Sequence, residues 1–491
     1  MTGSRSPWPL VGLLYLTGLL AAAQLGKLSA LAPLVAADLR LSLPTMASAI
    51  SLLELGGATL GAVAGLLAHR LGLRRSLRWG LACLALGGLG GALAQGEVGL
   101  LGWRLLEAAG YLGVIVSAPV LIAHHTADHA ADRTADHTDH RAADRSTAQT
   151  AAIADAHADA PGRITRARTQ GLALTLWSTF VPVGLALGAW ASAELADRLG
   201  WRGAVLAGGA VAALLWSGVW RARLPAAAEA SAAALPPLSG VAPGLVAGEA
   251  PLRAAGLVAD PAPSAPSGSS AISAASATPA TPATPRLGPA AWCLALAFGG
   301  FALFQVGLLA LLPTWLVQQA GLSAAAAGQW TGLAALSAVA GSASAAALLH
   351  HGRALRGPVM LSLGLPALVL WGVFASAPAA GPAITLVVVI NLLGGVFASL
   401  VFALLPVVAG SSGQMVRANG LLAQCGASGS LLGPPLMAAA VQAGGWPAAA
   451  LLGGGVTLLA LPLAWRALAP AQPAGRSAAD GGHSQAGHPL R

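Results

Sequence analysis

Residues 8–36 read WPLVGLLYLTGLLAAAQLGKLSALAPLVA, a stretch long and apolar enough to cross a lipid bilayer as a helix. This stretch also holds Lys27, the only lysine in the chain. A charge at such a depth costs roughly 3 kcal/mol, so charges of this kind face an internal partner or a water-filled path. The stretch therefore predicts a membrane-spanning helix that carries a functional cation.

The composition agrees with a membrane protein. The chain is 56% hydrophobic and only 9% charged, whereas soluble domains are about 25% charged. The net charge of +9 comes from arginines in short segments between apolar runs, which argues against a nucleic-acid partner. No HExxH motif, phosphate-binding loop or nucleophile elbow is present, so we expect no enzyme. The three cysteines have no metal-ligand spacing, and we expect neither a metal site nor a cofactor.

Twelve apolar segments are long enough to span a bilayer. They are residues 8–36, 46–68, 76–95, 98–123, 169–192, 202–220, 289–317, 325–349, 357–376, 381–409, 415–440 and 446–467. We therefore predict an all-α polytopic membrane protein with two pseudo-symmetric halves of six helices, at 1–220 and 289–468. The Ala-, Pro- and Ser-rich segment 221–288 should be a disordered cytoplasmic linker, and 469–491 a disordered tail.

The positions of the basic residues predict the orientation. With both termini in the cytoplasm, 21 of the 26 lysines and arginines fall in cytoplasmic segments, as the positive-inside rule requires. We expect a multi-pass protein of the cell (inner) membrane that contacts lipid. We also expect a monomer, because a path for a small solute would lie within one chain.

The two halves also resemble each other in sequence. GWRGAVLAGG at 200–209 aligns with GWPAAALLGG at 445–454, and Pro33 followed by Leu41-Ser42 resembles Pro313 followed by Leu322-Ser323. Internal repeats of this kind are typical of transporters in which the solute binds between the halves.

Two motifs resemble the major facilitator superfamily. GLLAHRLGLRR at 65–75 is similar to the loop between its second and third helices, with His69 in place of the usual aspartate. The resemblance implies a conformational latch of six residues, namely Gly65, His69, Arg70, Gly72, Arg74 and Arg75. The second motif is RLLEAAG at 104–110, which resembles the superfamily's Arg-x-x-Gln/Glu-Gly pattern in the fourth helix.

Within the superfamily, the chain looks similar to the cyanate- and nitrate-type permease group. The similarity rests on Gln24-Leu-Gly-Lys27 in the first span and on WSTFVPVG at 177–184. It implies a small, anionic solute.

The amino-terminal half holds the charged candidates for solute binding or coupling. Arg104 and Glu107 are three residues apart and share a helix face, which Tyr111 continues. Arg104 and Glu107 form an internal salt bridge, or Glu107 is a proton carrier whose pKa is set by Arg104. Lys27 and Gln24 share a face of the first span, where Lys27 attracts the solute or neutralises Glu54. Glu54 is then either the partner of Lys27 or a proton carrier.

The carboxyl-terminal half has no ionisable residue deep in a span. Its polar candidates include Gln305 and Asn391, which bind the solute or hydrogen-bond between helices. We expect charge chemistry in one half and selection by hydrogen bonds in the other.

The segment 124–168 contains HHTADHAADRTADHTDHRAADR. Histidine-rich tracts bind zinc or nickel, and His125 with His129 would share a helix face. The near-repeat favours a solvated, dispensable cytoplasmic loop.

The leading hypothesis is a secondary active transporter. It would move a small anionic solute by alternating access, driven by the proton gradient, with Lys27 attracting the solute and Glu54 or Glu107 carrying the proton. The alternatives are a proton-coupled exporter of lipophilic drugs, and a metal-responsive membrane sensor that uses the histidine-rich segment.

Overall fold

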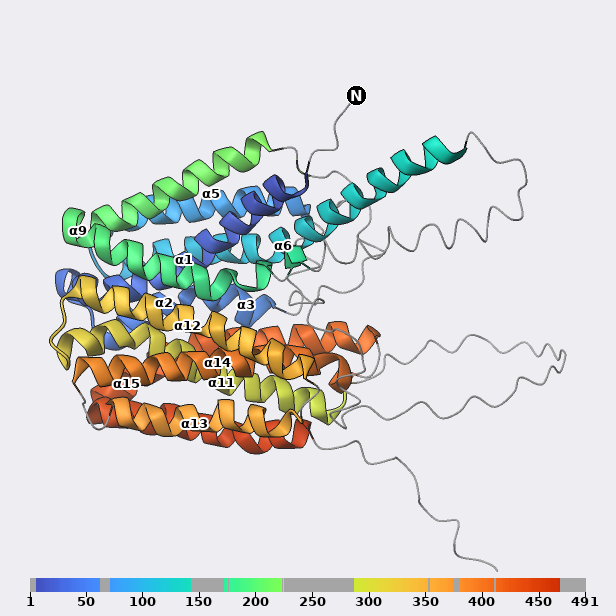
Figure 1. Ribbon diagram of the computed structural model, residues 1–491. Helices are drawn as coiled ribbons and strands as arrows, with labels where there is room; N and C mark the ends of the chain where they lie inside the picture. The colour runs from blue at the N-terminus through green and yellow to red at the C-terminus, as the bar shows by residue number, and fades with distance from the viewer. Residues whose placement is uncertain are drawn as a thin grey trace, which may run out of the picture.

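The computed structural model describes residues 6–61, 71–142, 172–174, 176–222, 224, 287–351, 354–374, 379–409 and 412–468. These residues are helical apart from short connections, which confirms the all-α prediction. The elements are α1 (Trp8–Leu39), α2 (Leu43–Ser51), the 3-10 helix η1 (Leu52–Glu54), α3 (Leu55–Leu60), α5 (Leu73–Gly91), α6 (Glu97–Ala142), α9 (Phe180–Arg221), α11 (Pro289–Gln318), α12 (Ala324–His350), α13 (Arg356–Phe374), α14 (Ala380–Ala409) and α15 (Ser412–Ala467). In Figure 1 they lie side by side along one common direction.

Nine helices in the described part of the chain are long and apolar enough to cross a membrane. This count does not confirm the predicted twelve spans, and the difference has two physical sources. Gly200 in α9 and Gly444 and Gly445 in α15 have non-helical backbone angles, so α9 and α15 each contain two helical segments but are counted once each among the nine. In addition, α5 begins with three arginines in its first six residues, and it is not among the nine.

One predicted loop is partly helical. The segment 124–168 was expected to be a loop, but α6 continues through its first part as far as Ala142. Alanine has the highest helix propensity of all residues, and four alanines between 127 and 135 favour continuation of the helix beyond the apolar span. The predicted linker 221–288 and tail 469–491 lie almost entirely outside the described residues.

The sequence repeats correspond to matching local structures. Pro33 lies inside α1 and Pro313 inside α11. The serine that follows each of these helices caps the next one, with Ser42 Oγ accepting from Thr45 N and Ser323 Oγ accepting from Ala326 N, each at 3.2 Å.

The glycines before the two tryptophans match as well. Gly200 has φ 70° and Gly445 has φ 73°, a left-handed conformation that glycine adopts without steric cost. Each of the two glycines reverses the chain before Trp201 or Trp446, so the last two helical segments of each half can lie antiparallel.

The two halves of the bundle, α1 to α9 and α11 to α15, appear in Figure 1 as a blue-to-green layer above a yellow-to-red one. We call the end of the bundle where α1 begins the Trp8 end, and the end where α1 finishes the Leu39 end. At the Trp8 end each half has its own buried apolar cluster, and neither cluster includes a described residue of the other half. At the Leu39 end the clusters are shared, because Ala47 joins the carboxyl-terminal cluster and Ala310 joins the amino-terminal one.

Close backbone contacts seal the Leu39 end. Ser29 Oγ donates to Leu309 O at 2.8 Å across the halves, and Gly328 packs against Ala193 and Ala30. A Cβ on Gly332 would lie 2.8 Å from Ala186 O. Small residues allow α9 and α12 to approach this closely, so the halves are joined more tightly at the Leu39 end.

We predict that Gly332→Leu opens the Leu39 end, because the added side chain would collide with backbone atoms of α9 that cannot move aside independently. The measurement is thiol labelling of Ser29→Cys, which replaces a buried side chain, in a background without Cys83, Cys293 and Cys425. Labelling should become several-fold faster with Gly332→Leu.

The matched control is Gly12→Leu, because a Cβ at Gly12 meets nothing within 4 Å. Its labelling rate should equal that of the parent. Equal rates for all three versions, each monodisperse on gel filtration, would contradict the prediction.

Candidate functional site

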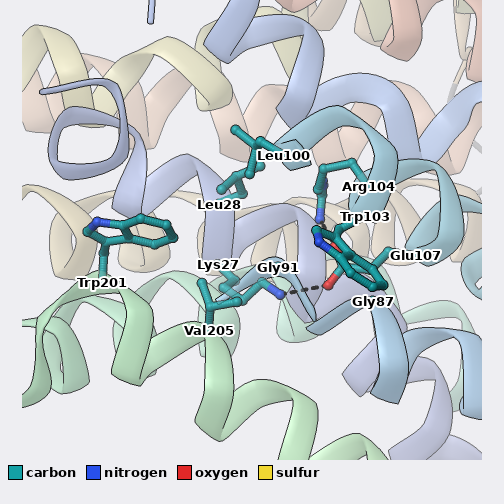
Figure 2. Close-up of a pocket in the computed structure, with 10 residues that line it drawn as sticks. All are labelled: Lys27, Leu28, Gly87, Gly91, Leu100, Trp103, Arg104, Glu107, Trp201 and Val205. Atoms are coloured by element: carbon teal, nitrogen blue, oxygen red, sulfur yellow. Dashed lines mark hydrogen bonds and ion pairs between the residues drawn. The ribbon is translucent and has the colours of Figure 1, made fainter. Parts of the chain in front are cut away.

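Three ionisable residues predicted from the sequence come together in the amino-terminal half as one ion cluster, formed by Lys27 of α1 with Arg104 and Glu107 of α6. Lys27 Nζ donates to Glu107 Oε1 at 2.9 Å, and the Arg104 guanidinium pairs with Glu107 Oε2. Figure 2 shows the ammonium directed at this carboxylate. The three residues are only 4%, 3% and 2% exposed, respectively. Two cations therefore share one buried carboxylate, and the ion cluster carries a surplus positive charge when all three groups are ionised.

Arg104 is held by the backbone as well as by Glu107. Its Nε donates to Ala49 O at 2.8 Å and its second terminal nitrogen to Ile50 O at 3.1 Å. These carbonyls lie where α2 ends and η1 begins, and helix ends leave carbonyls without a partner inside the helix. Arg104 thus satisfies backbone groups of the second span, while Gln24 O of α1 lies 3.5 Å from the same guanidinium.

A small pocket adjoins the ion cluster, with room for about one water molecule. Figure 2 shows its lining, which comes from α1, α5, α6 and the part of α9 after Gly200. All of these helices belong to the amino-terminal half, so in this conformation the pocket lies inside one half and is too small for a solute.

Glu54 lies elsewhere, so the expectation that Lys27 neutralises Glu54 is wrong. Lys27 pairs with Glu107, whereas Glu54 accepts a hydrogen bond from the Tyr111 hydroxyl at 3.2 Å. Glu54 is half-buried and precedes residues that contact the other half. Gln424 Nε2 donates to Ala58 O at 3.2 Å, and Gly57 packs against Ala427 of α15. Glu54 is therefore the carboxylate next to the interface between the halves.

The predicted polar residues of the carboxyl-terminal half form a second pair. Gln305 Nε2 of α11 donates to Asn391 Oδ1 of α14 at 2.6 Å, and Asn391 Nδ2 donates to Val387 O at 2.9 Å. Asn391 is fully buried. Within the described part of the chain, Gln305 Oε1 and Gln24 Oε1 are buried oxygens that accept no hydrogen bond. A buried polar atom without a partner costs free energy, so each oxygen is available to a donor.

Tyr15 was not among the predicted site residues. Its hydroxyl and that of Thr179 lie 2.8 Å apart, linking α1 to the residue before α9. The sequence contains a feature that points to Tyr15 as a site residue. The chain has only two tyrosines, and both lie in apolar spans, where a tyrosine hydroxyl requires a hydrogen-bond partner.

The predicted latch is only partly within the described residues. Gly65, His69 and Arg70 lie outside them. Gly72 has φ 83° and precedes α5, whose first residues include Arg74 and Arg75. The left-handed backbone at Gly72 explains why a glycine stands at this position. The latch itself stays a prediction.

Where the structure describes side chains, no group of three His, Cys, Asp or Glu residues could hold a metal ion.

The composition of the ion cluster predicts an order of stability among variants. Lys27→Met leaves Arg104 and Glu107 as a neutral pair, whereas Glu107→Gln leaves two buried cations without a counter-charge. Removing one partner of a buried pair costs about 3–5 kcal/mol when it leaves an uncompensated charge. Thermal unfolding of the purified variants should therefore give a lower Tm for Glu107→Gln than for Lys27→Met, and the reverse order would contradict the shared-carboxylate arrangement.

The fold is similar to that of known transporters. One solved structure is described as a bacterial homolog of the human lysosomal transporter Spinster, in an inward-facing and unoccupied conformation. It matches with a TM-score of 0.61 and 13% sequence identity, over 96% of this chain and 96% of the other. No curated protein matches this chain.

The sequence itself matches a family model described as Major Facilitator Superfamily, over residues 160–430. The match covers more than half of the 491 residues and includes α9 and most of the carboxyl-terminal half. A multi-pass helical bundle of this family is a membrane transporter of small solutes rather than an enzyme. The chain belongs to the Major Facilitator Superfamily.

Proposed function

We propose that this protein is a secondary active transporter of a small anionic solute, driven by protons moving with the solute. The surplus positive charge of the ion cluster carries the proposal. A buried cation without its own counter-charge is costly, and an anion that binds beside Lys27 would offset this cost. A lipophilic cation would increase it, which is the reason for preferring the anion permease to a drug exporter.

Alternating access would expose the site to each side of the membrane in turn. The shared apolar clusters at the Leu39 end and the separate clusters at the Trp8 end support a state sealed at the Leu39 end. With both termini in the cytoplasm, as the basic residues favour, this state would face inward. Because the pocket beside the ion cluster holds about one water molecule, solute binding would require the helices around it to move apart.

Glu54 is the better candidate for the proton carrier. Protonation of Glu107 would leave Lys27 and Arg104 buried together without a counter-charge, a state with a large free-energy cost. Glu54 is half-buried beside the interface between the halves. Within the described region, its carboxylate accepts one hydrogen bond, from the neutral Tyr111 hydroxyl. Its protonation would remove a charge from a span without creating an unpaired one.

The carboxyl-terminal half would select the solute by hydrogen bonds. The Gln305–Asn391 pair supports this role, because Asn391 fixes the amide of Gln305 while Gln305 Oε1 has no donor in the described region. A protonated oxyanion or a solute N–H group would supply one. The resemblance of Gln24-Leu-Gly-Lys27 and of residues 177–184 supports membership of the cyanate- and nitrate-type group. We also propose that the protein is a monomer of the inner membrane.

We predict that a small anion stabilises the purified protein against heat and that Lys27→Met abolishes this effect. A ligand at 100 times its dissociation constant adds about 2.7 kcal/mol to the free energy of unfolding. The screen compares small inorganic and organic anions with lipophilic cations, using Tm as the readout.

The control variant for this screen is Arg198→Ala, which removes an exposed cation that pairs with Glu194 away from the ion cluster. It should keep the anion effect. Stabilisation by lipophilic cations, equal in the parent and in Lys27→Met, would instead support the exporter.

We further predict that Glu54→Gln separates solute movement from proton movement. Glutamine can still accept from Tyr111, but it cannot take up a proton. In proteoliposomes, exchange of the stabilising anion across the membrane should persist, whereas accumulation driven by a pH gradient should be lost.

The control for Glu54→Gln is Tyr111→Phe, which removes the hydrogen bond and keeps the carboxylate. Accumulation should persist in Tyr111→Phe. If Glu54→Gln still accumulates the anion at the parental level, Glu54 is not the proton carrier.

A further inference from the structure

Each half of the bundle carries an arginine stacked on a tryptophan at the Trp8 end. In the amino-terminal half, Arg78 Cζ of α5 lies 4.2 Å from the centre of the Trp220 ring of α9. In the carboxyl-terminal half, Arg356 Cζ of α13 lies 5.3 Å from the centre of the Trp465 ring of α15. Both distances are those of a cation–π interaction. We call these contacts the two Arg–Trp pairs.

The two Arg–Trp pairs belong to the internal repeat of the chain. Each tryptophan is followed by an arginine in the last turn of its helix, at 220–221 in α9 and at 465–466 in α15. These two Trp-Arg dipeptides are separated by the same number of residues as the repeats at 200–209 and 445–454. Both halves therefore place the same residue types at the same end of their last helix.

The tryptophans of the pairs lie on the outer surface of the bundle. Trp220 and Trp465 are each 53% exposed, and the arginines that follow them are exposed as well. In Figure 1 the light-green end of α9 lies along the upper edge of the bundle, and the red end of α15 lies along the lower edge. In a membrane transporter, exposed tryptophans at the ends of spanning helices lie at the level of the lipid head groups.

The positive charge of the two pairs is not balanced by a described carboxylate. Within the described residues, neither Arg78 nor Arg356 forms an ion pair, and neither do the arginines that follow the two tryptophans. Arg202 provides a contrast at the Leu39 end, because it also lies over a tryptophan, Trp201, but pairs with Asp38. A surplus of positive charge therefore distinguishes the two Arg–Trp pairs.

The position of the arginines within their helices also favours a bound anion. Arg78 is the sixth residue of α5, which begins LRRSLR, and Arg356 is the first residue of α13. A cation near the amino-terminus of a helix is repelled by the helix dipole, and a negative charge there offsets the repulsion. The tryptophan ring holds the guanidinium in one plane, and the N–H groups of a guanidinium match the oxygens of a phosphate.

We propose that the two Arg–Trp pairs bind the head groups of anionic phospholipids, one lipid beside each half. The lipid phosphate accepts hydrogen bonds from the arginine, and the acyl chains lie along the apolar outer surface of the same helices. With both termini in the cytoplasm, as the basic residues favour, both sites face the leaflet whose anionic lipids attract basic segments. Lipid binding takes place on the outside of the bundle and does not depend on the identity of the solute.

The test is native mass spectrometry of the purified full-length protein in detergent, titrated with phosphatidylglycerol or with zwitterionic phosphatidylcholine. The double variant Arg78→Gln/Arg356→Gln removes both guanidinium groups of the pairs. The matched control is Arg198→Gln/Arg202→Gln, which removes the same number of positive charges from arginines that form ion pairs at the Leu39 end.

The parent and the control should each bind two molecules of phosphatidylglycerol more tightly than phosphatidylcholine. The double variant should bind phosphatidylglycerol about fivefold more weakly at each site. Because Arg356 also donates to Leu468 O at 2.9 Å, the single variant Arg78→Gln is measured as well, and it should retain one tightly bound lipid. Equal binding of the two lipids to the parent, undiminished phosphatidylglycerol binding in Arg78→Gln, or equal weakening in the control would overturn the proposal.

Discussion

The amino-terminal half depends on the burial of Arg104. A guanidinium can be buried only if its donors are satisfied and its charge is balanced. Glu107 balances the charge, and the carbonyls of Ala49 and Ile50 take the remaining donors. Those carbonyls are available because α2 changes to a 3-10 helix at Leu52. One side chain of α6 thereby bonds the backbone at the place where the second span changes from an α-helix to a 3-10 helix.

The break in the second span also determines the position of Glu54. Because Glu54 ends η1, it is turned away from the ion cluster, toward Tyr111 and the part of the chain that contacts α15. The amino-terminal half thus separates two functions. One carboxylate neutralises buried cations within the half, and the other lies at the interface that must change when the halves move. For the proposed proton-coupled transport, this separation would let Glu54 take up a proton while Glu107 keeps balancing the buried cations.

Much of this arrangement could be predicted from the sequence, because charges inside apolar spans are few and costly. That cost identifies Lys27, Arg104 and Glu107 as site residues, and the spacing of three residues places Arg104 and Glu107 in contact. The partner of Lys27 could not be predicted in the same way. Sequence gives the depth of a residue in a span but not the rotation of one helix against another, and the 3-10 turn at Leu52 changes that rotation for Glu54. The helical extension of α6 was missed because its composition resembles a solvated loop, although its alanines favour helix.

The proposed function depends on a solute that is an anion held by the surplus charge of the ion cluster. The most direct measurement is an experimental structure of the protein in lipid with a stabilising anion bound. We expect the anion beside the Lys27 ammonium, with the distance from Lys27 Nζ to Glu107 Oε1 longer than 2.9 Å. An anion bound away from Lys27, with the Lys27–Glu107 pair unchanged, would contradict it.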